Sequence, residues 1–476
     1  MAAPSLVTAD RPSVTVQLVL SWRASSARHE TCIDPEVSPM RSPSGRRRLL
    51  AIAAIVGGVA LLGTTAATLL RPSPAEPPPA SAAVAETALG RAISAAQARL
   101  RATPEDPETW ARLGSAYVEQ ARITADPSYY AKAQGALEKS LAQRPENGPA
   151  LIGMGSLANA RHDFTAARDW GLRARAVLPD TAEVYGVLAD AHTQLGETDE
   201  ATAAVQRMLD LEPGVPAFTR ASYDLELHGR VDEARQALGR ALQDATGPDD
   251  IAFCQYYLGE LAFDSGDLDL ADEHYDRGLA ADPNDTTLAH GKARTAAARG
   301  RTDEALSAYL TITSRVPLPQ YLQEYAALLT SAGRTDDAAR QYDVLAQQEE
   351  VLTAAGSVDD LAASVVAADR GDADSALRHA EAEWSRRPNI LVADALAWAL
   401  HLNGRDAEAL GYADRAAALG KVDAGFAFHR GVILAAVGRA DEAVAVLDAA
   451  LRANPHFSPL HAPQAQRALA DLRSPR

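Results

Sequence analysis

A stretch of about eleven residues recurs along most of this chain, and its spacing constrains the fold more than any other feature. The copy LGETDEATAAV begins at residue 195, and seven related copies follow it, the last being VGRADEAVAVL at residues 437–447. Each copy contains one marker glycine, and neighbouring marker glycines lie 33 to 38 residues apart. A period in this range indicates one small unit that is copied along the chain and buries its apolar face against the neighbouring copies. The marker glycines are Gly196, Gly229, Gly266, Gly300, Gly333, Gly371, Gly404 and Gly438.

Each copy has the chemistry of a tight turn between two helices. A glycine such as Gly266 can adopt the left-handed conformation that ends a first helix. The acidic residues that follow, as in GRTDE, favour the start of a second helix because they face its unpaired N–H groups and its dipole. Prolines then recur at the repeat spacing, and we expect them to end the second helices because proline disfavours a helical residue before it. These prolines are Pro145, Pro179, Pro213, Pro283, Pro317, Pro388 and Pro455.

The segment ETWARLGSAYVEQ shows what the first helix of a unit looks like. Helical spacing places Trp110, Leu113 and Tyr117 on one face around the small residue Gly114. This pattern resembles the first helix of a tetratricopeptide repeat (TPR), W-x2-L-G-x2-Y. The matching second helix ends at Pro145, and a seven-residue insert around ITADPSY is expected to lengthen the turn between the two helices.

Residues 252–283 match the same family most strongly. Gly259 and Ala271 fall where the two helices of a unit touch, and a longer side chain there would force the helices apart. The resemblance, to a membrane-anchored bacterial type of TPR protein, implies an all-α fold of helix-turn-helix repeats stacked into a right-handed superhelical solenoid, preceded by one transmembrane helix. The unit around residues 347–388 is irregular, so we expect a distortion or a long linker helix there.

The repeats define a domain map for the body of the chain. About ten TPR units fit into residues 107–455. Residues 86–106 are expected to form a leading cap helix, and residues 456–476 a C-terminal cap helix and tail. Both ends of a solenoid need such a cap, because the last unit would otherwise expose its apolar face.

An uncharged segment near the N-terminus predicts a membrane anchor. Residues 49–70 contain 22 residues without a charge, directly after Arg46, Arg47 and Arg48. That length spans a hydrocarbon core of about 30 Å. Because positive charges favour the cytoplasmic side, we expect a single-pass signal anchor with a cytoplasmic N-terminus and an extracytoplasmic TPR body at the cell membrane. The alternative is cleavage of the segment and secretion of the body.

The residues around this segment complete the map. Residues 71–85 are rich in proline and alanine and favour an extended stalk. Residues 1–48 form an N-terminal cytoplasmic extension in this interpretation. Because Met40 opens a well-formed basic region, translation starting there, with residues 1–39 not translated, is a further hypothesis.

Charge and composition narrow the classes of partner. The net charge is −17, and residues 1–71 carry +4, which leaves −21 for the remainder. A body this acidic repels nucleic acid, so we expect no nucleic-acid partner. With 42 arginines and only 4 lysines, the composition suggests a GC-rich bacterial genome.

Motifs that carry chemistry are missing from the sequence. It contains no phosphate-binding loop, no H-E-x-x-H, no C-x-x-C and no G-x-S-x-G, and its two cysteines cannot build a disulfide framework. His274, in DEHYD, is interpreted as part of a solvated helix face or a contact to the next unit, and His456 and His461 as parts of a capping turn. We therefore expect no enzyme activity, no catalytic residue, no cofactor and no metal.

The TPR resemblance implies a partner-binding groove instead. First helices of such repeats line a concave surface, where aromatic and charged residues anchor a protein or peptide partner. The alternative is that some of these rings pack between superhelical turns. The expected function is a non-catalytic scaffold for protein–protein interaction at the outer face of the cell membrane, with self-association left open; the alternative is an enzyme or accessory subunit with an unrecognised site between repeats. The predicted partner-binding residues are Tyr223, Glu226, Phe253, Tyr256, Glu260, Phe263, His290, Arg294, Trp398 and His401.

Overall fold

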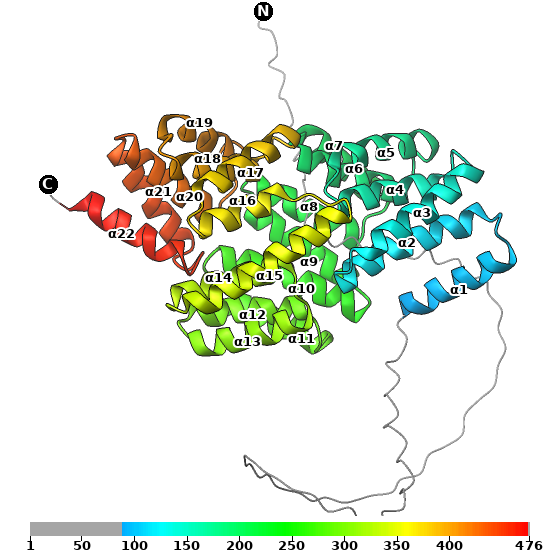
Figure 1. Cartoon of the computed structure of the whole chain (residues 1–476), viewed down its shortest axis with the longest axis horizontal. Coiled ribbons are helices and arrows are strands. Elements are labelled where there is room, and N and C mark those ends of the chain that lie inside the picture. Colours follow the sequence, from blue (N-terminus) through cyan, green and yellow to red (C-terminus); the bar gives the residue numbers. More distant parts are fainter. Residues whose placement is uncertain (1–87, 475–476) are drawn as a thin grey trace, which may run out of the picture. The chain divides into compact units, whose positions relative to one another are not determined.

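A computed structural model describes residues 88–474 of the chain. These residues form 22 α-helices, and no strand occurs among them (Figure 1). The predicted cytoplasmic extension, the anchor at residues 49–70 and the stalk lie outside the described residues. Within the described part, every helix is too short or too polar to serve as a bilayer-spanning segment.

Helices α2 to α21 follow one another as ten helix pairs, with α1 before the first pair and α22 after the last. In each pair an even-numbered first helix is followed by an odd-numbered second helix. The helices are α1 (Ala88–Ala102), α2 (Pro107–Thr124), α3 (Ser128–Gln143), α4 (Gly148–Ala160), α5 (Phe164–Val177), α6 (Ala182–Leu195), α7 (Thr198–Leu211), α8 (Val215–Leu227), α9 (Val231–Asp244), α10 (Pro248–Asp264), α11 (Leu268–Ala281), α12 (Thr286–Ala298), α13 (Thr302–Arg315), α14 (Pro319–Ser331), α15 (Thr335–Ala354), α16 (Asp360–Asp369), α17 (Ala373–Arg386), α18 (Ile390–Leu402), α19 (Asp406–Ala416), α20 (Ala424–Ala436), α21 (Ala440–Ala453) and α22 (His461–Arg473).

The turn between the two helices of a pair, which we call the elbow, is built as the sequence predicts. All eight marker glycines have a φ between 71° and 85°, the left-handed region that glycine adopts at little cost. The acidic residues that follow lie in the first turn of second helices such as α7, α9 and α13. The prolines also act as expected: α11 ends at Ala281 and α17 at Arg386, two residues before Pro283 and Pro388.

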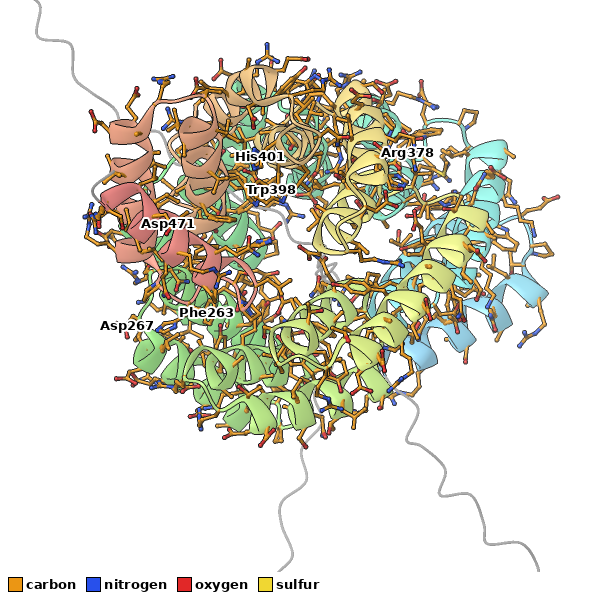
Figure 2. All side chains as sticks on the ribbon, turned by 60° about the vertical axis from the view of Figure 1, so that its left-hand side comes forward. Phe263, Asp267, Arg378, Trp398, His401 and Asp471 are labelled. Carbon is orange, nitrogen blue, oxygen red and sulfur yellow. The ribbon has the colours of Figure 1, made fainter. Side chains whose placement is uncertain are left out.

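Small residues allow the two helices of a pair to approach closely. A Cβ atom on Gly259 of α10 would lie 2.3 Å from the ring of Tyr275 on α11, so only glycine fits there. Phe263 is buried in the same pair, whereas Asp267, Arg378 and Asp471 are exposed on the outside of the helices (Figure 2).

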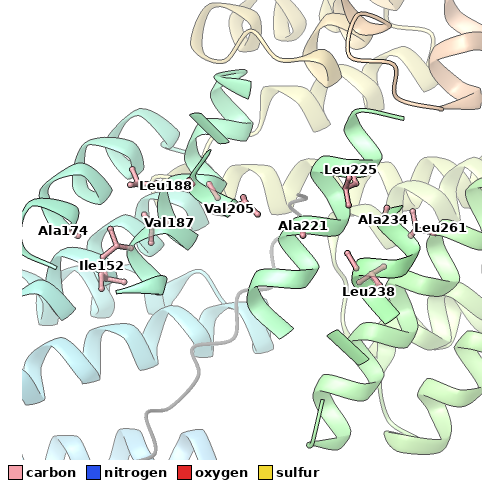
Figure 3. Close-up of a cluster of buried hydrophobic side chains, with 14 of the residues drawn as sticks. Ile152, Ala174, Val187, Leu188, Val205, Ala221, Leu225, Ala234, Leu238 and Leu261 are labelled. Carbon is pink, nitrogen blue, oxygen red and sulfur yellow. The ribbon is translucent and has the colours of Figure 1, made fainter. Parts of the chain in front are cut away.

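The apolar core runs along the array rather than collecting at one centre. One cluster of buried side chains extends from Ile152 on α4 through Leu188 on α6 and Leu225 on α8 to Leu261 on α10 (Figure 3). Each helix contributes a few alanine, valine or leucine side chains to the boundary with the next. This is the arrangement expected when every unit buries its apolar face against its neighbours.

Two helices depart from the regular length. The seven-residue insert of the first unit does not lengthen the turn, as the sequence suggested; it extends the first helix, so that α2 has 18 residues while α4 has 13. The physical reason is that ARIT continues the helical face, and the chain leaves the helix only at Ala125, which has a φ of 53°. The irregular unit contains α15, with 20 residues, followed by α16, with only 10. The long helix expected near residue 347 is thus confirmed.

Segments that lie about 190 residues apart in the sequence pack against each other, and we call these contacts the seam. Asn389, before α18, donates a hydrogen bond from Nδ2 to the carbonyl oxygen of Gln194 at 2.7 Å. Asn454, after α21, donates in the same way to the carbonyl oxygen of Phe263 at 2.9 Å. Between them, the Nζ of Lys421 lies 3.3 Å from a carboxylate oxygen of Glu226.

A fourth contact belongs to the seam and comes first in sequence order. His162, at the elbow of α4 and α5, lies with its Nδ1 3.4 Å from a carboxylate oxygen of Asp359, just before α16. The elbows of four successive pairs therefore each meet the linker that follows the pair five places further along. The later half of the array is packed onto the earlier half at regular intervals.

Candidate partner-binding cavity

The first helices of the early pairs and the helices α14 to α17 enclose a cavity of about 1440 Å³. Its wall begins with α2 and α4, continues with α6, α8 and α10, and closes with the long helix α15 and the short helix α16. Pockets for small molecules have volumes of about 300–1000 Å³. The cavity is therefore of a size for a segment of polypeptide.

Five of the ten residues predicted from the sequence line this cavity: Tyr223 and Glu226 on α8, and Phe253, Tyr256 and Glu260 on α10. Phe253 and Tyr256 are partly exposed and are linked through the ring of Tyr257, whose centroid lies 4.8 Å from one and 5.0 Å from the other. They form an aromatic strip on one wall of the cavity.

Tyr223 and Glu226 are tied to the seam. Tyr223 is only 4% exposed and also borders a smaller cavity of about 240 Å³ next to Pro388 and Asn389. Burial raises the pKa of Tyr223 above its usual value. For Lys421, burial acts to lower the pKa, but Asp423 and Glu226 outweigh it and raise the pKa, so this lysine is charged. The ring of Tyr223 is buried by packing between distant parts of the array. This matches the alternative given from the sequence, in which some of the rings pack between superhelical turns.

Phe263, His290 and Arg294 do not line the cavity; Phe263 and His290 are buried, and Arg294 is partly buried among charged and aromatic partners. The guanidinium of Arg294 lies 4.1 Å from the ring centroid of Phe263 and is paired with Glu260. The Nε2 of His290 lies 2.7 Å from a carboxylate oxygen of Glu324. Burial would raise the pKa of Glu324, but the charges of His290 and Arg294 outweigh it and lower the pKa to about 2. These side chains use their charges within the protein.

Trp398 and His401 lie on α18 (Figure 2) and are not among the residues that line the cavity. Their rings stack with centroids 5.0 Å apart, and Trp398 also stacks on His429 at 4.3 Å. His461 packs against the same group, with its centroid 5.3 Å from that of Phe428. The structure thus places Trp398 and His401 in an aromatic cluster between α18, α20 and α22.

The histidines considered as metal ligands are explained by packing. His274 does not face solvent or the next unit, as the sequence suggested; it is buried against the first helix of its own pair, with Nδ1 2.7 Å from Oε1 of Gln255. Burial, and then the neighbouring His429, lower the pKa of His461 to about 4. Within residues 88–474 no three histidine, cysteine or acidic side chains gather in a way that could hold a metal ion.

Comparison with known proteins agrees with the helix pairs. Residues 148–216, 221–286 and 403–456 match the tetratricopeptide repeat family. These three segments carry tetratricopeptide repeats. Their matched segments contain five of the eight marker-glycine elbows described above, those of Gly196, Gly229, Gly266, Gly404 and Gly438.

Solved structures of other proteins are similar to parts of this chain. A thermophilic TPR protein of Thermus thermophilus is 22% identical, with 40% of this chain and 98% of that chain covered and a TM-score of 0.35. A human IFIT1 dimer with m7Gppp-AAAA is 17% identical, with 69% and 76% covered and a TM-score of 0.45. Yeast Tom70 is 14% identical, with 81% and 86% covered and a TM-score of 0.36. No curated protein matches the sequence.

The side of the cavity formed by the two irregular helices, α2 and α15, was not predicted from the sequence. Ile123 at the end of α2, and Val344 and Val351 on α15, line the cavity, with exposed fractions of 52%, 38% and 57%. The signal was present in the sequence, because the insert in the first unit and the long spacing near residue 347 are the places where the TPR pattern fails. These departures were interpreted as distortions rather than as parts of a site.

A second missed residue is His162, at the TPR elbow between α4 and α5. It has a φ of 62°, in the region that the eight marker glycines occupy at later elbows. For a residue other than glycine this conformation is uncommon and carries strain, and it often marks a functional position. His162 lines the cavity, and its ring stacks on Phe164 with a centroid distance of 5.5 Å.

Proposed function

We propose that this protein is a non-catalytic TPR scaffold that binds a protein or peptide partner within its cavity and holds that partner at the outer face of a bacterial cell membrane. The observation that carries the binding role is the cavity of about 1440 Å³, with the aromatic strip of Phe253 and Tyr256 on its wall. Partly exposed aromatic side chains in a concave surface are the anchors that protein interfaces use most.

The position at the membrane is proposed from the sequence. The uncharged residues 49–70, with Arg46–Arg48 before them, orient the body outward by the positive-inside rule. Protease should digest the body when it is added to cells whose outer layers have been removed and whose cell membrane is intact. A body that is protected from protease until the cell membrane is broken would contradict this orientation, and a body recovered only from the medium would indicate cleavage and secretion.

The binding role is tested by crosslinking the full chain in native membranes. The test variant is Phe253→Ala combined with Tyr256→Ala, since both side chains line the cavity and are partly exposed. Phe263 is unsuitable for this purpose, because it is buried and its removal would destabilise the fold. The control is Leu310→Ala on α13, which is exposed outside the cavity.

We expect one set of proteins to be captured by the natural chain and by the control, and to be lost with the double variant. Circular dichroism should show the same helix content for all three proteins. Equal capture by the natural chain and the double variant would exclude the cavity as the partner site.

A further inference from the structure

We infer that the occupant of the cavity is a positively charged peptide segment of a partner protein, whose apolar side chains are held between the end of α2 and the middle of α15. This inference rests on the proposed scaffold function and specifies its partner. It draws on three features of the cavity: the irregular helices, the charge of the lining and a buried acceptor without a donor.

The irregular helices supply apolar surface that nothing in the described structure covers. Elsewhere in the described residues most large apolar side chains pack between neighbouring helices, and the exposed exceptions do not line the cavity: Val177, Leu310, Val358 and Val422. Ile123 lies in the extra turn of α2, and Val344 and Val351 lie on the lengthened α15; all three are exposed, and all three line the cavity. Apolar side chains exposed together in a concave site indicate a binding surface.

The lining is more acidic than the chain as a whole. It contains nine aspartate and glutamate side chains, four arginines and no lysine, whereas the whole chain has 63 acidic and 46 basic residues. Glu349, which lies on α15 between Val344 and Val351, is exposed. A concave surface with an excess of one charge concentrates its field and favours a partner of the opposite charge.

The arginines of the lining are already engaged within the protein. Arg122 pairs with Glu119 on its own helix, with a distance of 2.6 Å between Nη2 and Oε1. Arg220 forms two hydrogen bonds with Asp190, at 2.6 and 2.7 Å.

The other two arginines are held as well. Arg387 is bound by Glu383, and Arg370 lies 5.4 Å from the ring centroid of Tyr342. The arginine pairs also engage Glu119 and Asp190, and Glu226 and Glu260 are paired with Lys421 and Arg294. The negative excess that the lining offers to an incoming segment therefore rests on its remaining acidic residues, among them the exposed Glu349.

A buried acceptor in the wall also calls for a donor. The side chain of Asn159 on α4 lines the cavity and is 7% exposed; its Nδ2 donates to the carbonyl oxygen of Val187 at 3.2 Å. Its Oδ1 has no hydrogen-bond partner among the described residues. A buried acceptor without a donor is unfavourable, and a backbone N–H or a guanidinium of a bound peptide would satisfy it.

The experiment measures the binding of labelled synthetic peptides to the full chain by fluorescence anisotropy. Three peptides of equal length place two residue types in the same pattern along the chain. The first contains leucine and arginine, the second leucine and glutamate, and the third serine and arginine. We expect the leucine–arginine peptide to bind at least about tenfold more tightly than either of the others, because it alone matches both the charge and the apolar surface. Binding should weaken as salt is added.

Matched variants locate the site. Ile123→Ser combined with Val351→Ser should lower the affinity for the leucine–arginine peptide by about tenfold, because the peptide loses its contacts with two exposed apolar side chains. Leu310→Ser, which is equally exposed but lies outside the cavity, should leave the affinity unchanged. All of these side chains are exposed, so the variants should fold.

Each failure has a distinct meaning. Equal affinity for the arginine and glutamate peptides would overturn the inference, and so would arginine-peptide binding that survives the Ile123 and Val351 substitutions, because the peptide would then bind the acidic surface at large. If no peptide binds but crosslinking still captures a partner that depends on Phe253 and Tyr256, this inference fails and the scaffold function stands. If the peptides bind as expected but no partner is captured, the scaffold function fails instead.

Discussion

The elbow glycines of the array form two groups that share one backbone conformation and differ in their surroundings. At Gly196, Gly229 and Gly266, an added Cβ would lie 2.7, 2.2 and 2.8 Å from a carbonyl oxygen of a linker in the later half of the chain. At the other five elbows, nothing lies within 4 Å of such an atom.

The two groups look alike in the sequence because the local left-handed turn favours glycine at all eight of these elbows. At the seam, glycine has a second role: its missing side chain lets two distant backbones touch. A repeat pattern therefore reports the local conformation of each unit and is silent about contacts between units that are five places apart.

The largest expected effect is that of Gly229→Ala, at the most crowded seam elbow. The alanine would carry the strain of a φ of 71° and would meet the carbonyl oxygen of Gly420. Together the strain and the overpacking should lower the free energy of unfolding by about 3 kcal/mol, measured by denaturant unfolding. A loss no greater than that of the same substitution at an elbow with empty surroundings would contradict this prediction. The seam would then accommodate the added methyl group without a loss of stability.

A smaller effect is expected from pH, through Asp224 on α8 beside the seam. Burial raises the pKa of this carboxyl group to about 8, well above its unfolded value. The folded state therefore holds a proton that the unfolded state releases, and stability is full below about pH 4 and is lost as the pH rises toward 8.

Between pH 5 and 7 the free energy of unfolding should fall by about 2.5 kcal/mol through this carboxyl group. Asp224→Asn should flatten the dependence and make the variant the more stable protein at pH 8. Unfolding curves at several pH values would check this, and parallel pH profiles for the two proteins would contradict it.

The hydrogen bond of Asn454 tests the seam without altering a glycine. Asn454→Ala leaves the carbonyl oxygen of Phe263 without its 2.9 Å donor in a buried place, which should cost about 1–2 kcal/mol. Hydrogen exchange should speed up at the elbow of α10 and α11, far from the substitution in sequence. The exposed Asn284 provides the control, since Asn284→Ala should change neither quantity.

The smallest effect is expected at an open elbow. Gly404→Ala should cost only the strain of a left-handed alanine, about 1 kcal/mol, because its surroundings are empty. The difference between Gly229→Ala and Gly404→Ala in denaturant unfolding then isolates the contribution of the seam contact. Equal losses at the two positions would erase the distinction between the two groups.

What the sequence predicted was local in origin. The elbows, the acidic helix starts and the prolines after the second helices follow from residues within a few positions of each other. Phe263 shows where this reasoning ends: its repeat position suggested a concave surface, yet it is buried with Arg294 over its ring. Which residues of a first helix stay open depends on how neighbouring helices close over them.

The cavity itself required both halves of the array. Ile123 and Val351 belong to units far apart in the sequence, and no periodic signal connects them. The sequence did mark both places as irregular. His162 could have been noticed too, since it stands at the position where the eight later elbows have a marker glycine.

The seam also bears on how such a chain can change its length during evolution. A solenoid that contacts only nearest neighbours can gain or lose a unit by duplication or deletion and keep every remaining interface. Here, deletion of one unit between α12 and α17 would move every later linker by one place. Asn454 would then meet the elbow of Gly229 instead of the carbonyl oxygen of Phe263. Every other linker that follows the deleted unit would likewise meet the wrong elbow. The copy number of the repeats is thereby fixed by contacts that no single repeat contains.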